Sequence, residues 1–350
     1  MRDAQMLPWF PLDMSHLTPE QKEPSEDHFM FRRMNETFPT ADSKVEDLPS
    51  DRPVRVYTEY EYIQKYLTDP RFVVTDCRED ADILWLVSHF QDFRALREKP
   101  HSRVNQCPCE HLLTVKDLLA IICRRALDGE NDLQDPDIKG PSWLPVTYCL
   151  KRELVQFISY FQRREMRGED NHWIVKPWNL ARGLDHTITK NLNHILRLPS
   201  TGPKIAQKYI SNPVLFHRAD IRADVKFDLQ FIVMLLNAQP LKVAVYKGFW
   251  IRFANETFDL TQLDNEQKHF TVNNYKNAFL LQMYCHDFIA KFNAQYPDST
   301  WKIVEKKIYS MFLKVFKAAT MRDPPAGIPH NPQCKGFYGF DVMLEWQNEG

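Results

Sequence analysis

This sequence of 350 residues contains few glycines, 10 against 23 prolines. Neither Gly-x-Gly-x-x-Gly nor Gly-x-x-x-x-Gly-Lys occurs in it, which argues against the usual glycine-rich nucleotide loops. No Ser-His-Asp pattern, His-Glu-x-x-His motif or suggestive pair of carboxylates stands out among its histidines and acids. The commonest signatures of dinucleotide enzymes, P-loop proteins, hydrolases and zinc proteases are therefore missing.

The sequence also lacks paired cysteines at zinc-ligand spacing, long apolar runs and a net charge of one sign. Its seven cysteines include Cys107-Pro108-Cys109, which is too closely spaced, and no second pair follows at metal-ligand distance. They predict reduced thiols in a cytosolic or nuclear protein. No apolar run resembles a signal peptide or a membrane span. The formal charge of −1 gives no global reason to bind nucleic acid or a membrane.

The length predicts two or three subdomains, because 350 residues exceed what one small core needs. Residues 1–52 are rich in Pro, Glu, Asp and Ser without a period, which predicts a linker or disordered lead-in. Residues 53–142 are predicted to form a small α/β subdomain. Its signals are strands at 55–57, 72–74 and 83–87, a helix at 58–67, a second helix from 114 to 129, and a surface loop at 129–142.

Later segments predict strands and helices in alternation. Residues 226–236 form the best strand, with alternate residues Phe227 to Leu235 on one face and Asp228 and Gln230 together on the other. We expect a hairpin of 241–246 with 249–253 across Lys247-Gly248. Three further elements are predicted: a helix with Leu154, Phe157, Ile158 and Phe161 on one face, a helix capped by Asp298, and a final strand at 336–346.

A sparse series of charged residues follows these strands. Lys176 ends the run Trp173-Ile174-Val175, where a cation could meet a phosphate; the alternative is a snorkelling lysine at a strand end. Lys226, Asp228 and Arg252 come next, and Asp341 lies in the final strand. Such a series suits phosphate clamping by point charges together with a magnesium carboxylate.

Eight short motifs in order make the sequence similar to the tubulin–tyrosine ligase-like family between about residues 53 and 346. They are Arg103-Val104-Asn105-Gln106-Cys107-Pro108 with Leu113-Thr114-Val115-Lys116-Asp117, Trp143-Leu144-Pro145-Val146-Thr147-Tyr148, Trp173-Ile174-Val175-Lys176-Pro177, Gln207-Lys208-Tyr209-Ile210 with Asn212-Pro213, Lys226-Phe227-Asp228-Leu229, Arg252-Phe253-Ala254, His269-Phe270-Thr271 and Tyr338-Gly339-Phe340-Asp341. The resemblance implies an α+β, ATP-grasp-like ligase fold in which ATP lies between two antiparallel-sheet lobes behind a smaller N-terminal domain.

The resemblance also implies an activity and roles for particular residues. Family enzymes use ATP to phosphorylate a carboxylate on tubulin, and the amine of an amino acid then attacks the acyl phosphate. The implied cofactors are ATP and magnesium, and the implied partners are tubulin and microtubules, or else other acidic or histone tails, in the cytoplasm at the cytoskeleton or in the nucleus. By analogy, Lys176 contacts phosphate, Asp341 holds magnesium, Lys226, Asp228 and Arg252 line the reacting groups and nucleotide, and the adenine hinge is Gln207, Lys208, Tyr209 and Ile210.

Four departures from the family pattern predict weak or absent catalysis. Gln230 replaces an arginine, and a neutral amide cannot neutralise a transferring phosphoryl group. Val272 stands where an asparagine is expected, and the phosphate loop is reduced to Arg182-Gly183-Leu184-Asp185. A second metal motif, Glu-x-Asn, would follow Asp341 beyond Gly350, so residues 143–350 are expected to be an ATP-grasp domain truncated at its C-terminus.

We therefore expect a catalytically deficient protein that binds tubulin or another acidic tail and regulates tubulin modification. The alternatives are an active ligase that adds tyrosine or glutamate to tubulin carboxylates, and an interaction scaffold. Candidate tail-binding cations are Arg218, Arg222 and Lys226 together with Arg163, Arg164 and Arg167, unless each cluster is only a solvated face. His269 is expected to be a core histidine rather than a catalyst.

Overall fold

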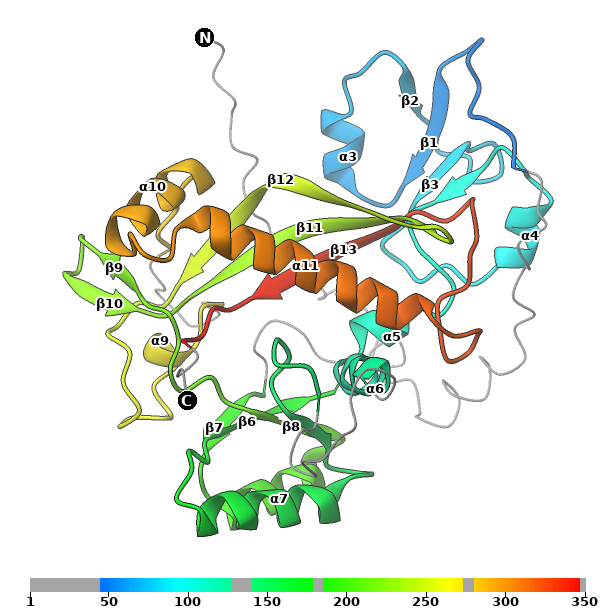
Figure 1. Cartoon of the computed structure of the whole chain (residues 1–350). Helices are drawn as coiled ribbons and strands as arrows, with labels where there is room; N and C mark the ends of the chain where they lie inside the picture. The colour runs from blue at the N-terminus through cyan, green and yellow to red at the C-terminus, as the bar shows by residue number, and fades with distance from the viewer. Residues whose placement is uncertain (1–44, 128–139, 179–184, 273–279, 347–350) are drawn as a thin grey trace. The chain divides into compact units, whose positions relative to one another are not determined.

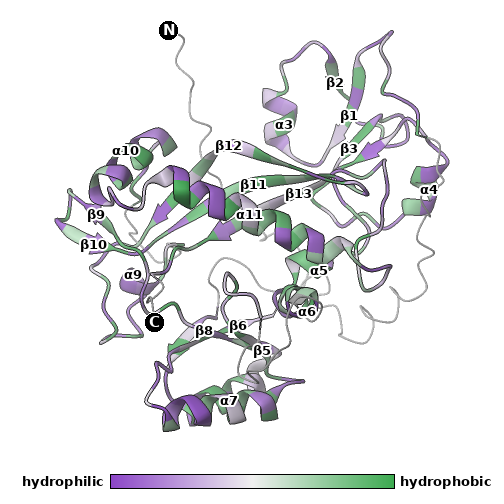
Figure 2. Cartoon of the chain, viewed as in Figure 1, coloured by the Kyte–Doolittle hydropathy of each residue, from purple (hydrophilic) through white to green (hydrophobic). Residues whose placement is uncertain are grey.

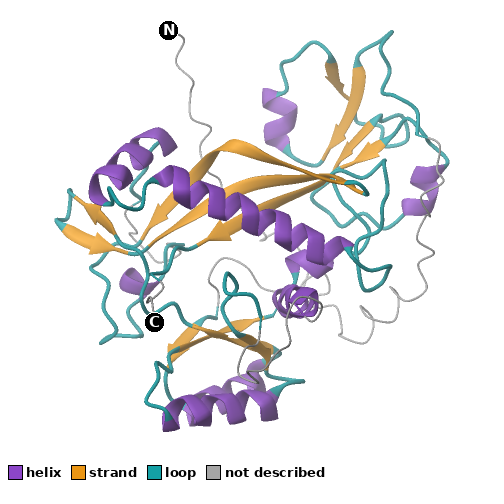
Figure 3. Cartoon of the chain, in the orientation of Figure 1, coloured by secondary structure: helices purple, strands orange, loops and turns teal. Residues whose placement is uncertain are grey.

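The structure is a computed structural model that describes residues 45–127, 140–178, 185–272 and 280–346 (Figure 1). All described residues belong to one unit, which spans residues 39–350. Helices and strands are both well represented in it, as Figure 3 shows, so the predicted α+β class is confirmed. Among the described residues, no helix has the length and apolar character needed to cross a membrane.

The N-terminal strands form a parallel sheet in the order β2-β1-β3-β4. The elements are β1 (Val54–Thr58), α3 (Glu61–Tyr66), β2 (Phe72–Val74), β3 (Ile83–Trp85), α4 (Phe93–Arg97) and β4 (Arg103–Val104). The strands and the helix predicted between residues 55 and 87 are therefore present. The expected boundary at residue 142 stays a prediction.

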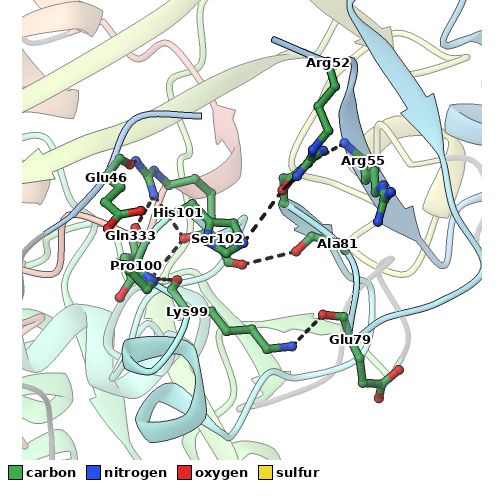
Figure 4. Close-up of polar contacts among 12 residues, drawn as sticks. Glu46, Arg52, Arg55, Glu79, Ala81, Lys99, Pro100, His101, Ser102 and Gln333 are labelled. Atoms are coloured by element: carbon green, nitrogen blue, oxygen red, sulfur yellow. Dashed lines mark hydrogen bonds and ion pairs between the residues drawn. The ribbon is translucent and has the colours of Figure 1, made fainter. Parts of the chain in front are cut away.

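Buried polar side chains fasten this sheet internally and to a distant loop (Figure 4). The Asp82 carboxylate, fully buried, accepts two hydrogen bonds from the Arg52 guanidinium, at 2.6 and 2.8 Å, and one from the Arg55 N–H. The buried Gln333 amide donates to the carbonyl groups of Leu96, Lys99 and Ser102. The chain segment that enters the final strand is thereby held against the N-terminal sheet.

A second sheet is antiparallel, in the order β5-β8-β6-β7. It consists of β5 (Thr147–Cys149), β6 (Trp173–Pro177), β7 (Thr187–Thr189) and β8 (Lys204–Lys208), with α7 (Leu154–Met166), α8 (Leu192–Arg197) and η1 (Leu198–Thr201) nearby. Helix α7 has hydrophobic and hydrophilic stripes (Figure 2). The predicted stripe residue Phe157 is buried against Trp173, with ring centroids 5.0 Å apart.

The third and longest sheet is antiparallel, in the order β12-β11-β13. Its strands are β11 (Phe227–Ala238), β12 (Leu241–Phe253) and β13 (Gly336–Val342). The alternation predicted for β11 is confirmed, because Phe227, Leu229, Phe231, Val233 and Leu235 are all buried. Helix α11 (Trp301–Thr320) covers that face, where the rings of Phe231 and Phe312 lie 5.4 Å apart.

Short elements complete the described chain. Strands β9 (Phe216–Arg218) and β10 (Ala223–Val225) pair with each other, and the remaining helices are α5 (His111–Thr114), α6 (Lys116–Leu127), α9 (Glu266–His269) and α10 (Cys285–Gln295). The helix cap at Asp298 is wrong by two positions, since Thr300 precedes the first turn of α11. Most of the predicted loop at 129–142 lies outside the described residues.

The predicted hairpin across Lys247-Gly248 is wrong. β12 runs without a turn from Leu241 to Phe253 along the whole of β11, and the reversal of the chain lies at Gln239-Pro240. Phe231 pairs with Phe249 whereas Val233 pairs with Val245, so Lys247-Gly248 lies in a bulge that adds residues to β12. Pairing with the buried strand β11 therefore replaces the local turn.

Truncating Phe231 should destabilise the fold, because the side chain is fully buried against Phe249 and Phe312. We expect Phe231→Ala to lower the free energy of unfolding by about 3–5 kcal/mol, measured by urea denaturation. Val155→Ala on the exposed side of α7 is the control and should change it by less than about 0.5 kcal/mol. Equal effects of the two substitutions would contradict this packing.

Candidate functional site

Lys176 lies near the end of β6 and projects from the same face as Gln207 of β8. The Lys176 Nζ donates to Gln207 Oε1 at 2.7 Å, and Gln207 Nε2 donates to Thr147 Oγ1 on β5 at 2.9 Å. Ile174 pairs directly with Gln207, so Lys176 is its diagonal neighbour in the antiparallel sheet. This hydrogen-bonded row fixes the ammonium at one edge of the second sheet.

Lys226 precedes β11 and has an exposed fraction of only 2%. Its Nζ donates to the Tyr209 hydroxyl at 2.7 Å and lies 4.2 Å from the centre of the Tyr209 ring. Burial and, to a smaller extent, the charge of Lys176 lower the pKa of Lys226 to about 7, against the opposing effect of Asp228. Near neutral pH this amine is therefore poised between its charged and neutral forms.

Tyr209 connects Lys226 to His269. The Tyr209 hydroxyl lies 2.8 Å from His269 Nδ1, and His269 Nε2 lies 2.8 Å from the Gln262 carbonyl oxygen. Because a carbonyl only accepts, Nε2 carries the proton, and the tyrosine hydroxyl donates to Nδ1. His269 is buried with both nitrogens engaged, which agrees with the expected core role.

Arg252 holds two carboxylates on neighbouring strands. Its Nε and Nη2 each donate to the Asp228 carboxylate at 2.7 Å, and Nη2 also lies 2.8 Å from Asp341 Oδ1. Thr271 donates a further hydrogen bond of 2.7 Å to Asp228. Burial opposes the charge on Arg252, but its bonds to Asp228 and the nearby Asp341 outweigh this and raise its pKa. For Asp228, burial raises the pKa of the carboxyl group, and the Arg252 guanidinium opposes that rise.

Gln230 contributes to the same group of side chains. It is paired with Asp341 in the strand register, and its Nε2 donates to Asp341 Oδ1 at 3.3 Å. The expected magnesium ligand thus receives an amide and a guanidinium on one oxygen. No cluster of three or more His, Cys, Asp or Glu side chains suited to a metal is found within the described ranges. Magnesium usually takes one or two carboxylates besides the phosphates, and the carboxylates of Asp228 and Asp341 are both already paired with Arg252, so these residues fit it poorly.

The predicted residues of the two sheets converge. The positive charge of Lys176 lowers the pKa of Lys226, and the negative charge of Asp341 acts on Lys176 in turn. Burial lowers the pKa of Lys176 to about 8, and the charge of Lys116 adds to this effect. Lysines from separate elements therefore face one region beside the Arg252 network. A cluster of this kind suits a polyphosphate.

Two residues in this region were missed by sequence reasoning. Lys116 begins α6, and its charge acts on both Lys176 and His186. Burial lowers the pKa of His186 to about 3, and these two lysines add to the effect, so the ring is neutral. His186 Nε2 is buried without a hydrogen-bond partner. The motif that contains Lys116 was a usable signal, whereas a histidine before β7 gave none.

Other predicted residues lie away from this cluster. Lys208 forms an ion pair with Asp170 and donates to the His172 carbonyl at 3.2 Å, so its ammonium is engaged elsewhere. Ile210 follows β8 and is partly exposed. The adenine-hinge role of Gln207, Lys208, Tyr209 and Ile210 stays a prediction, as do the roles assigned to the other site residues.

The expected tail-binding clusters are largely engaged within the chain. Arg218 is not a surface cation: it is buried and donates to Ala254 O, Asn255 Oδ1 and the Asp220 carboxylate. The Arg218 guanidinium thus binds the two residues that directly follow β12. On α7, Arg164 pairs with Glu169 at 2.7 Å, and Arg167 lies 3.8 Å from the same side chain.

Comparisons with known proteins show which sequences this chain is similar to. Residues 94–349 match the model of the tubulin-tyrosine ligase family. The chain is 44% identical to tubulin–tyrosine ligase-like protein 12 of Homo sapiens and of Mus musculus, over 99% of this chain and 53% of each relative. It is 28% identical to the probable tubulin polyglutamylase TTLL2 of Homo sapiens, over 76% of this chain and 44% of that protein. The chain therefore spans about half the length of these relatives.

The buried amine of Lys226 should make stability depend on pH. Its folded pKa, about 7, lies below the unfolded value of about 10.4, so the unfolded chain binds more protons between these values. The free-energy cost of burying the protonated Lys226 amine is complete below pH 7 and disappears as the pH rises towards 10. We expect the difference in Tm between the wild type and Lys226→Met to shift in favour of the wild type from pH 6.5 to 9.5, measured by calorimetry. A pH-independent difference would contradict the assignment.

Proposed function

This chain belongs to the tubulin-tyrosine ligase family, and from that premise we propose that it binds ATP and an acidic protein tail while transferring amino acids weakly or not at all. Its fold is α+β and ATP-grasp-like, as expected for the family. The ligases of this family generally use ATP and magnesium. We propose residues 143–350 as the ATP-grasp domain and residues 53–142 as its smaller N-terminal subdomain.

Nucleotide binding is supported by two lysines from separate elements, since Lys176 contacts Gln207 and Lys226 contacts the nearby Tyr209. The charge of Lys176 lowers the pKa of Lys226, just as the charge of Lys116 lowers the pKa of Lys176. Mutual repulsion of this kind is relieved when an anion lies between the ammonium groups. We propose that the phosphates of ATP occupy that position. The hinge at Gln207 to Ile210 would border the adenine.

Catalytic deficiency is supported by one observation: the charges beside the lysines already neutralise one another. Arg252 spans Asp228 and Asp341, and the neutral amide of Gln230 contacts Asp341. No further guanidinium is present at this point of β11 to meet a transferring phosphoryl group. An arginine in that role supplies about a thousandfold or more in rate. Asp341, held by Arg252, is also a weak site for a metal.

The proposed partner is tubulin, and the alternatives are another acidic tail or a histone tail. The names of the similar proteins place tubulin as the substrate of several relatives, such as the probable polyglutamylase TTLL2 and tubulin glycylase 3D of Tetrahymena thermophila. A protein that binds the tail without modifying it regulates modification by occupancy. We accordingly propose a cytoplasmic location at microtubules, with the nucleus as the alternative for a histone-tail partner.

The second candidate is an active ligase that adds tyrosine or glutamate to tubulin carboxylates. One observation favours it: the amine of Lys226 is almost completely buried against the Tyr209 hydroxyl, two residues before Asp228 of the Asp228–Arg252 pair. A buried amine is costly to maintain without use. The two candidates differ in the rate of transfer, which is directly measurable.

Transfer of labelled tyrosine or glutamate to tubulin, at saturating ATP and magnesium, distinguishes the candidates. We expect incorporation by the wild type at background, and Gln230→Arg should raise it, because a guanidinium would then face the phosphoryl group. Gln239→Arg, in the exposed turn before β12, is the matched control and should stay at background. Robust wild-type incorporation that Lys176→Ala abolishes would overturn the deficiency and establish the second candidate.

A further inference from the structure

The face of the third sheet that bears Asp228, Gln230 and Asp341 continues as an apolar surface. In the strand register, Gln230 is opposite Trp250 and Asp341, Ile232 is opposite Gly339, and Met234 is opposite Phe337. Directly opposed residues share a face, so this surface extends along three strands from the ion network, which is Arg252 with Asp228 and Asp341. Helix α11 packs on the other face, where the Phe312 and Phe340 rings are 4.7 Å apart.

Large aromatic side chains on this surface are exposed. Trp250 is 42% exposed, Phe337 is 40% exposed and Tyr246 is 63% exposed, and the rings of Tyr246 and Trp250 are stacked 6.5 Å apart. On the opposite face, in contrast, Phe227, Phe231 and Phe249 are buried. Exposed aromatic groups gathered on one face of a sheet are typical of a binding surface.

At its far end the surface meets a cavity of about 460 Å³, between the N-terminal sheet, α5 and β13. Its wall is mainly apolar and aromatic, and its lining includes Ile63, Trp85, Val87, Glu110, Thr114 and Phe337. Trp85 meets Phe337 edge to face, with ring centroids 5.1 Å apart. The volume is sufficient for one large side chain with room to spare.

Two chain segments connect the cavity wall to the charged residues of the candidate site. Thr114 lines it, and Lys116, two residues further along, acts on Lys176. Phe337 and Asp341 lie four residues apart on the same face of β13, a separation of about 13 Å along the strand. An extended peptide covers that distance with about four residues. One ligand could therefore reach both places.

We propose that this aromatic surface carries the acidic acceptor tail, and that the cavity takes one large apolar or aromatic side chain of it, about four residues from the carboxylate at the ion network. The proposal rests on the proposed function and specifies its substrate class: an acidic peptide with a single apolar anchor.

The charges of the region match such a peptide. Strand β12 carries Lys242 and Lys247, both exposed, and contains no acidic residue. Asp228 and Asp341 are compensated by Arg252. Glu110, in contrast, lies on the wall of the cavity, so an acidic side chain is disfavoured there and an apolar one is accepted. Acidic residues along the strand and an apolar residue in the cavity therefore fit together.

The test uses fluorescence anisotropy with labelled Glu/Gly peptides of equal length and charge. They carry Phe four residues before a central glutamate, Phe four residues after it, or Ala in place of Phe. We expect one Phe peptide to bind the wild-type chain about tenfold more tightly than the Ala peptide, which is the usual size of a buried aromatic anchor. Phe337→Ser should reduce this preference to less than about twofold.

A second variant and a control guard against unfolding. Thr114→Trp fills the cavity from the exposed end of α5 and should abolish the preference as well. Leu313→Ser, at an exposed apolar position of α11, should preserve it. Equal binding of all peptides by the wild type, or a preference that survives Phe337→Ser, overturns the proposal of an apolar anchor in the cavity but not the proposed function. Failure of every acidic peptide to bind overturns the anchor together with the proposed function.

Discussion

The bidentate pairing of Arg252 with Asp228 is the interaction on which this site depends. A buried carboxylate without a partner is strongly destabilising, so the pair must stay together once β11 and β12 have paired. The same guanidinium reaches Asp341 at 2.8 Å and thereby ties β13 to the other two strands. The ion pairs of Arg252 therefore join the strands β11, β12 and β13. The charge that a nucleotide would meet is then left to Lys176 and Lys226.

This division explains how a nucleotide-binding framework can persist while its chemistry is weak. Binding of phosphate requires cations at the right positions, and the lysines provide them. Acceleration of phosphoryl transfer requires additional charge that is stronger in the transition state than in the ground state. Gln230 provides only an amide, which contacts Asp341. The features that recognise a ligand and those that transform it therefore depend on different residues.

Much of this arrangement could be predicted from the sequence, because strand periodicity is local. Alternation in residues 226–236 correctly placed Asp228 and Gln230 on the face opposite the buried one. Non-local pairing was harder: the turn expected at Lys247-Gly248 is a bulge, since pairing with β11 outweighs a weak local turn signal. The capture of Asp341 by Arg252, the burial of Arg218 and the cavity beside Phe337 arise only when distant segments meet.

The central claim is that Arg252 already satisfies Asp341, so that phosphate recognition rests on the lysines rather than on a bound metal. Calorimetric titration of the chain with ATP, once with magnesium and once with a chelator, tests this most directly. The account predicts that removing magnesium weakens ATP binding by less than about threefold, an energy near 0.7 kcal/mol. ATP binding that appears only when magnesium is present would contradict it.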